Sequence, residues 1–422
     1  MKRRIYVSPS ANRKSGYPNR YFVVLKENLG EYFDVLDSGN EPYLTQGWAL
    51  LKHSFKADIF LLSFVETIAF HKLAFIQYLM VRLSFLVMRL RRGRIVFIFH
   101  NPRPHKGENW MSRSLTRMQL TQSCLVVSHS CETAAFARAL LSEYGCSPDK
   151  VRYICHPIVD PSASVGGVSG CASAGAGSSV SAAEGASSFG ASDVGLAVGN
   201  VSAGTGSSVS TAAGASSFGT SAAGLAAVSA SATPSDEVLI WGNILPYKGV
   251  LEFVSSPAVR AAGLNVRIVG RCKDASLAAA IEKAVGQCNA GQSAEGSTYV
   301  DDSDYLPRTR IVFENRAADF EELADLIRSS RHVLFPYLPG SVSSSGVLMD
   351  TLSMGGNPVG PAIGAFADLA RENVCQVYGS EAEMIEILKS DRRINPETLR
   401  DFISRNSWQA YAKFFADFFS SR

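Results

Sequence analysis

The stretch VLIWGNILPYKGVLEFV, Val238 to Val254, decides the fold, because it joins two apolar runs through the turn GNILPYKG. The turn places Lys248 directly before VLEFV, the run that we expect to open a helix. A cation is locally disfavoured there, since the amino-terminal end of a helix is positive. A bound anion would resolve the conflict, because a lysine and free backbone N–H groups together make a phosphate site. The alternative is an exposed loop lysine, the commonest environment for this residue type.

Segments of the same kind recur along both halves of the chain, where short β-branched runs alternate with longer runs of helical character. This alternation predicts parallel sheets covered by helices, an α/β fold class with two doubly wound, Rossmann-like domains. The predicted strands are RIYVS, FDVLD, ADIFLLS, RIVFIFH, CLVVSH and VRYICHP in the first half, and VLIWG, NVRIVG, TRIVFEN, HVLFPY, NPVGPA and CQVYG in the second.

Between the two halves, Ser162 to Ser235 is almost wholly Ala, Gly, Ser and Val, with an internal duplication. SAGAGSSVS returns as SAGTGSSVS, and GASSFG occurs twice. Such a composition cannot bury enough apolar surface to offset chain entropy, and two copies are too few for a solenoid. We therefore predict a flexible insertion at 162–235, between an amino-terminal domain at 1–161 and a carboxyl-terminal domain at 236–422.

A second predicted anion site lies in HVLFPYLPGSVSSSGVLMDTLSMGG, where a strand leads through a serine-rich turn into a helix. Capping of the helix would account for one serine. Ser344, Ser345 and Gly346 together, in the same domain as Lys248, predict two helix amino termini that converge on one diphosphate. Asp350 follows about one turn later, where its carboxylate could bind ribose hydroxyls.

In the first half, His100 follows RIVFIF, at the carboxyl end of a predicted strand, where α/β clefts place functional groups. Asn101, His105 and Glu108 follow at once and add polar groups to the same strand end. A satisfied core histidine is the competing interpretation of His100. His129 and His156 also follow predicted strands and are equally well explained as structural residues, so the spacing identifies no general base.

The overall composition excludes several classes of protein. With 41 basic and 38 acidic residues the net charge is +3, so there is no global field for nucleic acid, and we expect no nucleic-acid partner. The 8 cysteines are scattered without C-x-x-C pairs, which predicts neither a metal site nor a disulfide framework. The basic start MKRRIYVSPSANRKSG has no apolar h-region, so we expect no signal peptide and a cytoplasmic protein.

The segment FHKLAFIQYLMVRLSFLVMRLRRGR, Phe70 to Arg94, raises the question of membrane contact. Arg82 and Arg89 interrupt its apolar run before the roughly 20 residues that a spanning helix needs. A buried or surface-lying helix is expected instead. Its arginine-rich end would suit anionic lipid headgroups on the inner face of a membrane, although a domain helix with a basic terminus is the commoner explanation.

Taken together, these motifs resemble those of the retaining nucleotide-sugar glycosyltransferases with the GT-B fold, family 4 or group 1-like, in the branch that assembles bacterial surface polysaccharides. The matching segments are FIFHNPRPH, VVSHSCETAAF, KVRYICHP, WGNILPYKGV and FPYLPGSVSSSGVLMDTLSMGGNPV, which cover nearly the whole chain apart from the insertion. The resemblance implies two domains facing a cleft, with the last helix crossing back to the first domain. It implies a nucleotide-sugar donor, a lipid-linked or oligosaccharide acceptor, and neither a cofactor nor a metal.

The resemblance also implies individual roles. Lys248, in the turn with Gly242 and Asn243, would bind the donor diphosphate; Ser344, Ser345 and Gly346 would bind the phosphate or the sugar. Asp350 would bind the ribose. His100 would face the cleft beside the donor sugar as the catalytic residue, with Asn101, His105 and Glu108 on the acceptor side.

Three departures from the family pattern bear on activity. Asn243 stands where many relatives carry a diphosphate-binding arginine, for which Arg271 is a candidate substitute. Val342 replaces the first of two usual glutamates, and Asp350 shortens the second. Two alternatives to a glycosyltransferase are therefore a non-catalytic scaffold with the same fold and a nucleotide-sugar epimerase of the same architecture.

Overall fold

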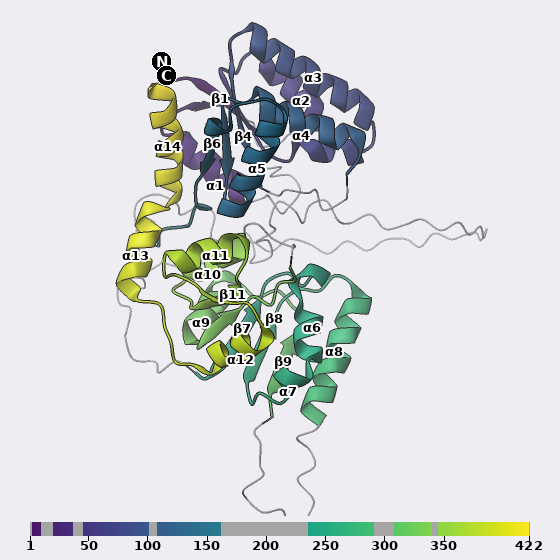
Figure 1. The fold of residues 1–422 in the computed structure, drawn as a ribbon, viewed down its shortest axis with the longest axis vertical. Helices are drawn as coiled ribbons and strands as arrows, with labels where there is room; N and C mark the ends of the chain where they lie inside the picture. The colour runs from purple at the N-terminus through teal and green to yellow at the C-terminus, as the bar shows by residue number, and fades with distance from the viewer. Residues whose placement is uncertain are drawn as a thin grey trace, which may run out of the picture.

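A computed structural model shows two α/β domains, one above the other in Figure 1. The structure describes residues 2–9, 20–36, 45–100, 108–161, 235–290, 308–339 and 345–421.

The amino-terminal domain is built on six parallel strands in the order β2-β1-β3-β4-β5-β6. The strands are β1 (Arg4–Ser8), β2 (Asp34–Val35), β3 (Ile59–Leu62), β4 (Arg94–Ile98), β5 (Leu125–Ser128) and β6 (Val151–Tyr153). The helices are α1 (Arg20–Leu29), α2 (Gln46–Ser54), α3 (Ala74–Leu90), α4 (Trp110–Gln122) and α5 (Cys131–Glu143), with 3-10 turns η3 (Val65–Phe70) and η4 (Pro148–Lys150).

Alternation along the strands divides the core of this domain into two layers, because successive side chains of a strand point to opposite faces. On one face Tyr6 and Phe60 pack with residues of α2, α3 and α4. On the other face Ile5 and Val7 pack with α1 and with a helix from the far end of the chain. The apolar residues on both faces explain why these strands read as nearly continuous apolar runs.

The carboxyl-terminal domain is built on six parallel strands in the order β12-β11-β10-β7-β8-β9. They are β7 (Glu237–Trp241), β8 (Asn265–Val269), β9 (Arg310–Glu314), β10 (His332–Leu334), β11 (Pro358–Pro361) and β12 (Gln376–Tyr378). The helices are α6 (Val250–Ser255), α7 (Pro257–Arg260), α8 (Ala275–Ala290), α9 (Phe320–Ser329), α10 (Gly346–Ser353), α11 (Gly364–Arg371) and α12 (Glu381–Lys389), with a 3-10 turn η7 (Pro246–Lys248).

The two sheets change winding direction at different places. Counted from β9, the carboxyl-terminal sheet has the Rossmann order 3-2-1-4-5-6, which reverses between β7 and β10. The amino-terminal sheet reverses between β1 and β3. Ligands of open parallel sheets bind outside the carboxyl ends of the strands at such a switch point, so each sheet offers one preferred location.

The chain ends by crossing back from the second domain to the first. Helix α13 (Pro396–Arg405) contacts the second domain, and α14 (Trp408–Ser420) then runs along the first beside α1 (Figure 1). Phe415 and Phe419 join the core of the first domain, and the Arg3 guanidinium donates to the Phe419 carbonyl at 2.9 Å. The two ends of the chain therefore lie together (Figure 1).

The sequence predicted the fold class correctly, and each predicted strand overlaps an observed one. The strand boundaries were too generous; VRYICHP extends four residues beyond the end of β6 at Tyr153. Apart from Ser235, the predicted insertion at 162–235 lies outside the described residues. None of the helices in the described part of the chain has the combined length and apolar character needed to cross a membrane.

Candidate functional site

The turn after β7 is shaped by close backbone contacts that require glycine. Gly249 has φ +65°, and a Cβ on it would lie 2.0 Å from the Pro336 carbonyl oxygen. Gly242 has φ +100°, and its own carbonyl oxygen would lie 2.0 Å from a Cβ on Gly270. The chain therefore packs tightly on the ends of β10 and β8, and this holds the residue between the two turns, Lys248, in a fixed place.

Lys248 is buried, which argues against the alternative of an exposed loop lysine. It is the last residue of η7 and only 5 % exposed, so it is not a solvated loop lysine. Its ammonium nitrogen lies 5.8 Å from the centre of the Tyr337 ring, within cation–π range. Helix α6 starts after Gly249 and has six residues, so the main feature of the site is the buried cation rather than a long helix dipole.

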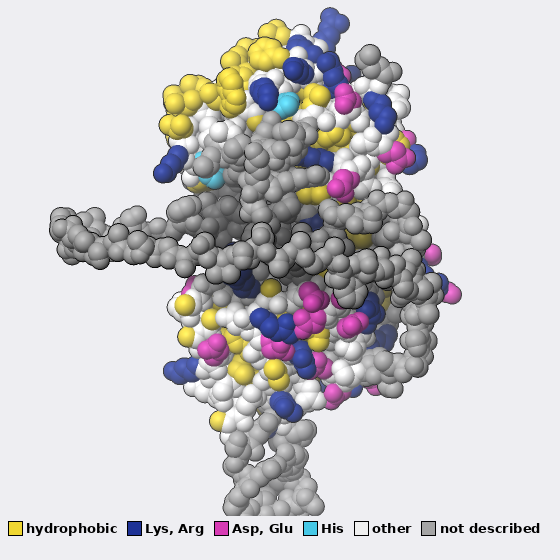
Figure 2. Space-filling view, turned by 180° about the vertical axis from the view of Figure 1, so that it is seen from behind, with side chains coloured by type: hydrophobic (Ala, Val, Ile, Leu, Met, Phe, Trp, Pro, Cys, Tyr) yellow, Lys and Arg dark blue, Asp and Glu magenta, His cyan; other side chains and the backbone are white. Residues whose placement is uncertain are grey.

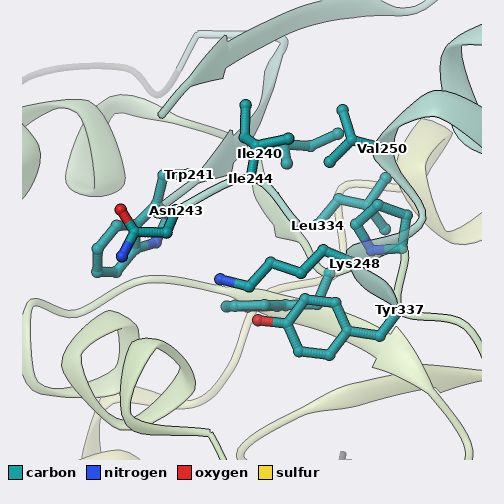
Figure 3. A pocket seen from close by; sticks show the side chains of 11 residues that line it. Ile240, Trp241, Asn243, Ile244, Lys248, Val250, Leu334 and Tyr337 are labelled. Carbon is teal, nitrogen blue, oxygen red and sulfur yellow. The ribbon is translucent and has the colours of Figure 1, made fainter. Parts of the chain in front are cut away.

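A small pocket surrounds Lys248 at the carboxyl ends of β7 and β10. Its walls include Trp241, Asn243, Ile244 and Tyr337, and the lysine side chain runs between them (Figure 3). This is the switch point of the carboxyl-terminal sheet. An ammonium group in a mostly apolar pocket attracts an anion more strongly than one in water, because the local dielectric constant is lower.

The start of α10 lies beside the same pocket. Val347, in its first turn, has methyl carbons 3.5 Å from the position of a Cβ on Gly242, and Lys248 Nζ lies 3.7 Å from that position. The Ser345 side chain accepts a hydrogen bond from the Leu348 amide at 3.4 Å, so this serine caps the helix. The first N–H groups of the helix, at Gly346 and Val347, have no intrahelical acceptor, and such groups at a helix start favour an anion.

Gly346 leaves room for such an approach, because a Cβ built on it would meet no heavy atom of the described residues within 4 Å. Ser344 lies outside the described residues. The structure thus brings together Gly242, Lys248, Ser345 and Gly346 from the predicted donor site. Glycines close α10 at its other end, where Gly355 has φ +81° and the Gly356 amide donates to the Thr351 carbonyl.

Asp350 lies one turn into α10 and faces the other domain. Its carboxylate is 3.5 Å from the guanidinium of Arg20, at the start of α1. Burial raises the pKa of Asp350, and Arg20 partly opposes that rise. The Arg20 guanidinium also lies over the Phe320 ring, 5.4 Å from its centre. Arg20 was not identified from the sequence, because no motif there signals a contact with a residue of the other domain.

The two remaining predicted donor residues differ in their placement. Asn243 lines the pocket, whereas Arg271 is exposed just beyond β8 and is not among the lining residues. The Arg271 carbonyl accepts from the Ile244 amide at 3.0 Å, so its backbone supports the turn. Within the described lining, Lys248 is the sole lysine or arginine.

The carboxyl edge of the amino-terminal sheet carries a cluster of histidines. His100, His129 and His156 follow β4, β5 and β6, and the neighbouring rings lie 5.3 Å and 5.2 Å apart between centres. His100 also stacks on Phe64 at 4.6 Å. Tyr21 of α1 contacts all three histidine rings, so this edge is filled with aromatic groups.

Hydrogen bonds fix the state of His129. Its Nδ1 lies 2.9 Å from the Ile154 carbonyl oxygen, which can only accept, so Nδ1 carries the proton. Nε2 then accepts from the Tyr21 hydroxyl at 2.9 Å. Burial, reinforced by His156, lowers the pKa of His100 to about 3, and burial lowers the pKa of His156 to about 4. The pKa of His129 is lowered too, chiefly by burial, so all three rings are neutral near pH 7.

Of the predicted acceptor-side residues, Glu108 is exposed and stands directly before Asn109, the capping residue of α4. Asn101 and His105 lie outside the described residues. The catalytic role of His100 stays a prediction, since its described contacts are with Phe64, Tyr21 and His129. In the described ranges, no three His, Cys, Asp or Glu side chains are placed to hold a metal ion together.

Comparisons with known proteins were made by sequence and by structure. No protein-family model matches the sequence, and no curated protein resembles it significantly. Among solved structures, HepE from Anabaena in complex with UDP-glucose is similar, with 11 % identity, a TM-score of 0.53 and 100 % of both chains covered.

Two sugar-phosphate synthases are also similar. Sucrose-phosphate synthase from Thermosynechococcus elongatus shares 12 % identity, with a TM-score of 0.56 over 100 % of both chains. The UDP-forming α,α-trehalose-phosphate synthase of Burkholderia vietnamiensis shares 11 % identity, with a TM-score of 0.53 over 100 % of this chain and 98 % of that one. At such low identity the likeness concerns architecture alone, and on that evidence the chain has the two-domain α/β architecture of the GT-B glycosyltransferases.

Proposed function

We propose that the chain is a glycosyltransferase that moves a sugar from a nucleotide-diphosphate donor to a hydroxyl group of an acceptor. The observation that carries the proposal is Lys248, a buried cation at the switch point of a Rossmann-ordered sheet. Gly242 and the first turn of α10 lie beside it, so an anion could meet the ammonium group and backbone N–H groups together.

This arrangement meets the main chemical demand of sugar transfer from such a donor. As the bond to the sugar breaks, negative charge grows on the departing diphosphate. A lysine already fixed in place stabilises that charge without reorganisation, and its effect is larger in a pocket that excludes water. Asp350, one turn along α10, is the group that we assign to the ribose hydroxyls.

The finer parts of the proposal follow from the motif resemblance. We infer a lipid-linked or oligosaccharide acceptor in the synthesis of bacterial surface polysaccharide, transfer with retention at the sugar, and a reaction at the cytoplasmic face of the membrane. His100 is proposed to face the donor sugar, with Asn101, His105 and Glu108 on the acceptor side. Neither a metal nor a cofactor is part of the proposed reaction.

Donor binding can be tested by the thermal stability of the full chain with UDP-, GDP- and CMP-sugars. A ligand at about 100 times its dissociation constant adds roughly 2.7 kcal/mol to the free energy of unfolding. We expect one nucleotide class to give such a shift, and the Lys248→Met variant, which keeps the apolar stem of the side chain, to lose most of it. Asn265→Ala is the control. Asn265 is the first residue of β8, at the opposite edge of the sheet from the pocket, so this variant should respond like the wild type.

Turnover separates an enzyme from a scaffold with the same fold. Release of free nucleoside diphosphate from the stabilising donor, faster in the presence of the wild-type protein than in that of Lys248→Met, supports a glycosyltransferase. A protein that binds the donor but releases no diphosphate with any acceptor would be a scaffold. A protein stabilised by none of the nucleotides would contradict the proposal.

A further inference from the structure

Helix α3 is unusual because it is apolar on the side that faces solvent. Its buried side includes Tyr78, Val81, Phe85 and Met88, which pack on the sheet. A surface helix normally carries polar residues opposite such a stripe. Here six large apolar residues on the opposite side are each between 46 % and 75 % exposed: Phe75, Ile76, Leu79, Leu83, Leu86 and Leu90. We call this set the apolar face of α3.

The spacing of these residues places them on one side of the helix. At about 100° per residue, the six fall within roughly a quarter to a third of the helical circumference, almost diametrically opposite the buried stripe. Figure 2 shows hydrophobic side chains gathered along the edge of the amino-terminal domain where α3 lies. Trp110, 56 % exposed at the start of the neighbouring helix α4, adds an exposed aromatic ring, which packs edge-on against Tyr78 at 5.4 Å.

The charged residues on the helices around the apolar face have a single sign. Helices α2, α3 and α4, which form one layer on the sheet, contain no aspartate or glutamate within Gln46–Ser54, Ala74–Leu90 and Trp110–Gln122. The charged residues of α3 are Arg82 and Arg89, and the exposed Arg92 follows its end. An apolar strip on helices whose charged residues are all basic complements a surface that is apolar inside and anionic outside, which is the composition of an anionic lipid bilayer.

Arg91 has a structural role, so it is not counted among the arginines that border the apolar face. Its guanidinium donates to the Ser54 carbonyl at 2.7 Å and the Ala57 carbonyl at 3.0 Å, at the end of α2. It therefore binds two helices together. The exposed Lys52 lies in the last turn of α2, and the exposed Phe55 and Lys56 follow its end, so further basic and apolar groups border the carboxyl-terminal end of α3.

We propose that the apolar face of α3 lies in the interfacial layer of an anionic membrane, parallel to its plane, with Arg89 and Arg92 at the lipid phosphates. A helix of 17 residues is about 25 Å long and lies on the bilayer rather than across it. The inference rests on the proposed function at one point only: it names the surface at which the enzyme would meet a lipid-linked acceptor. Membrane binding itself involves no step of sugar transfer.

The test uses the full chain and co-sedimentation with vesicles of phosphatidylcholine alone or mixed with phosphatidylglycerol. We expect the wild type to bind the anionic vesicles. A triple variant, Leu79→Ser with Leu83→Ser and Leu86→Ser, should bind roughly 30-fold more weakly. It lacks three leucine side chains whose transfer from water into the membrane would favour binding. Val312→Ser removes a comparably exposed apolar residue from β9, in the other domain, and should bind like the wild type.

The charges can be tested separately. Arg89→Gln with Arg92→Asn should weaken binding to anionic vesicles by about fivefold per charge at low salt, and by less at high salt. Asparagine is used at position 92 because that residue has φ +56°. Binding to phosphatidylcholine alone should not change.

Each outcome decides the proposal. A wild-type chain that ignores anionic vesicles, or a triple serine variant that binds them as well as the wild type, overturns it. So does a wild-type dimer that the triple serine variant dissociates, because the face would then pair with a second copy. A chain that binds vesicles but no nucleotide keeps this inference and loses the proposed function, and the reverse result does the opposite.

Discussion

The carboxyl edges of the two sheets have the same topological position in each domain but opposite chemistry. The edge of the second sheet holds Lys248, a cation in a pocket at the switch point. The edge of the first sheet holds three neutral histidines, which lie beyond β4, β5 and β6 rather than at its switch point between β1 and β3. A polar residue at a strand end therefore indicates a ligand site most strongly where the strand order also reverses.

The residues that surround Lys248 also differ from those that surround the three histidines. Lys248 is held by glycine turns that let backbone segments approach closely, which leaves an open pocket. The histidines are held by Tyr21, and Tyr411 and Trp408 of α14 pack on the same cluster. One edge therefore carries a buried cation beside a pocket, and the other is lined by aromatic side chains.

The largest expected effect comes from removing the cation of the second edge. Lys248→Ala should reduce turnover by about 100-fold or more, as single contacts to developing charge do. Steady-state release of nucleoside diphosphate measures this. His100→Ala, the corresponding change at the first edge, shows whether that edge takes part in the reaction as well. Unchanged kinetics in Lys248→Ala would remove the lysine from the site.

The second prediction concerns acid, which should affect the first edge more than the second. Folding lowers the pKa of His100 from 6.5 to about 3 and that of His156 to about 4. Protonation therefore favours the unfolded chain, so their contribution to stability is complete above pH 6.5 and is lost as the pH falls towards these folded-state values. The slope for each histidine is at most about 1.4 kcal/mol per pH unit.

Urea unfolding at several pH values between 7 and 5 measures this slope. His100→Phe keeps a ring against Phe64 but cannot titrate, so its stability should fall less steeply with acid than that of the wild type. Lys248→Ala should keep the wild-type slope. Identical slopes for the wild type and His100→Phe would mean that His100 is already hydrated in the native state.

A smaller effect is expected at the contact between the domains. Arg20→Gln removes the ion pair with Asp350, but the Arg20 side chain is 44 % exposed, so the loss of stability should stay below about 1 kcal/mol. Arg4→Gln is a matched control, because the Arg4–Asp58 pair is similarly exposed and lies within one domain. We expect nucleotide affinity, measured by calorimetry, to change in Arg20→Gln only, by less than about fivefold. Equal affinities in both variants would show that Asp350 does not contact the donor.

The smallest effect is expected from the chain that joins the two domains. Replacing residues 162–234 by a short Gly/Ser linker should leave the melting transition nearly unchanged, because that composition supplies no core. Ser235 is kept, since its amide and hydroxyl both donate to the Ser329 carbonyl. Loss of soluble protein on excision would show that the segment packs on one of the two domains.

The fold could be predicted from the sequence because it depends on local pattern. Runs such as RIVFIF and VLIWG are β-branched and apolar on both faces, which is the signature of buried parallel strands. The position of Lys248 in a turn was predictable for the same reason. Its burial was not, because that depends on Pro336 and Tyr337, which reach it only through the pairing of β7 with β10.

The contacts that the sequence did not indicate are those between distant segments. The histidine cluster needs three strands in register, and Arg20 reaches Asp350 only when the domains face each other. The apolar face of α3 also required the structure. The sequence showed an apolar segment, but which side of the helix packs on the sheet decided which residues remained exposed.

The return of α14 to the first domain has a consequence for protein synthesis. A ribosome completes the six strands of that domain early, yet Trp408, Phe415 and Phe419, which cover one face of its sheet, are made only after the second domain. While the second domain is translated, the side chains of Ile5, Val7 and their neighbours on the nascent first domain therefore remain exposed to solvent. The domain that begins folding first is thus the one that finishes last, and a chaperone would find its binding surface there during translation.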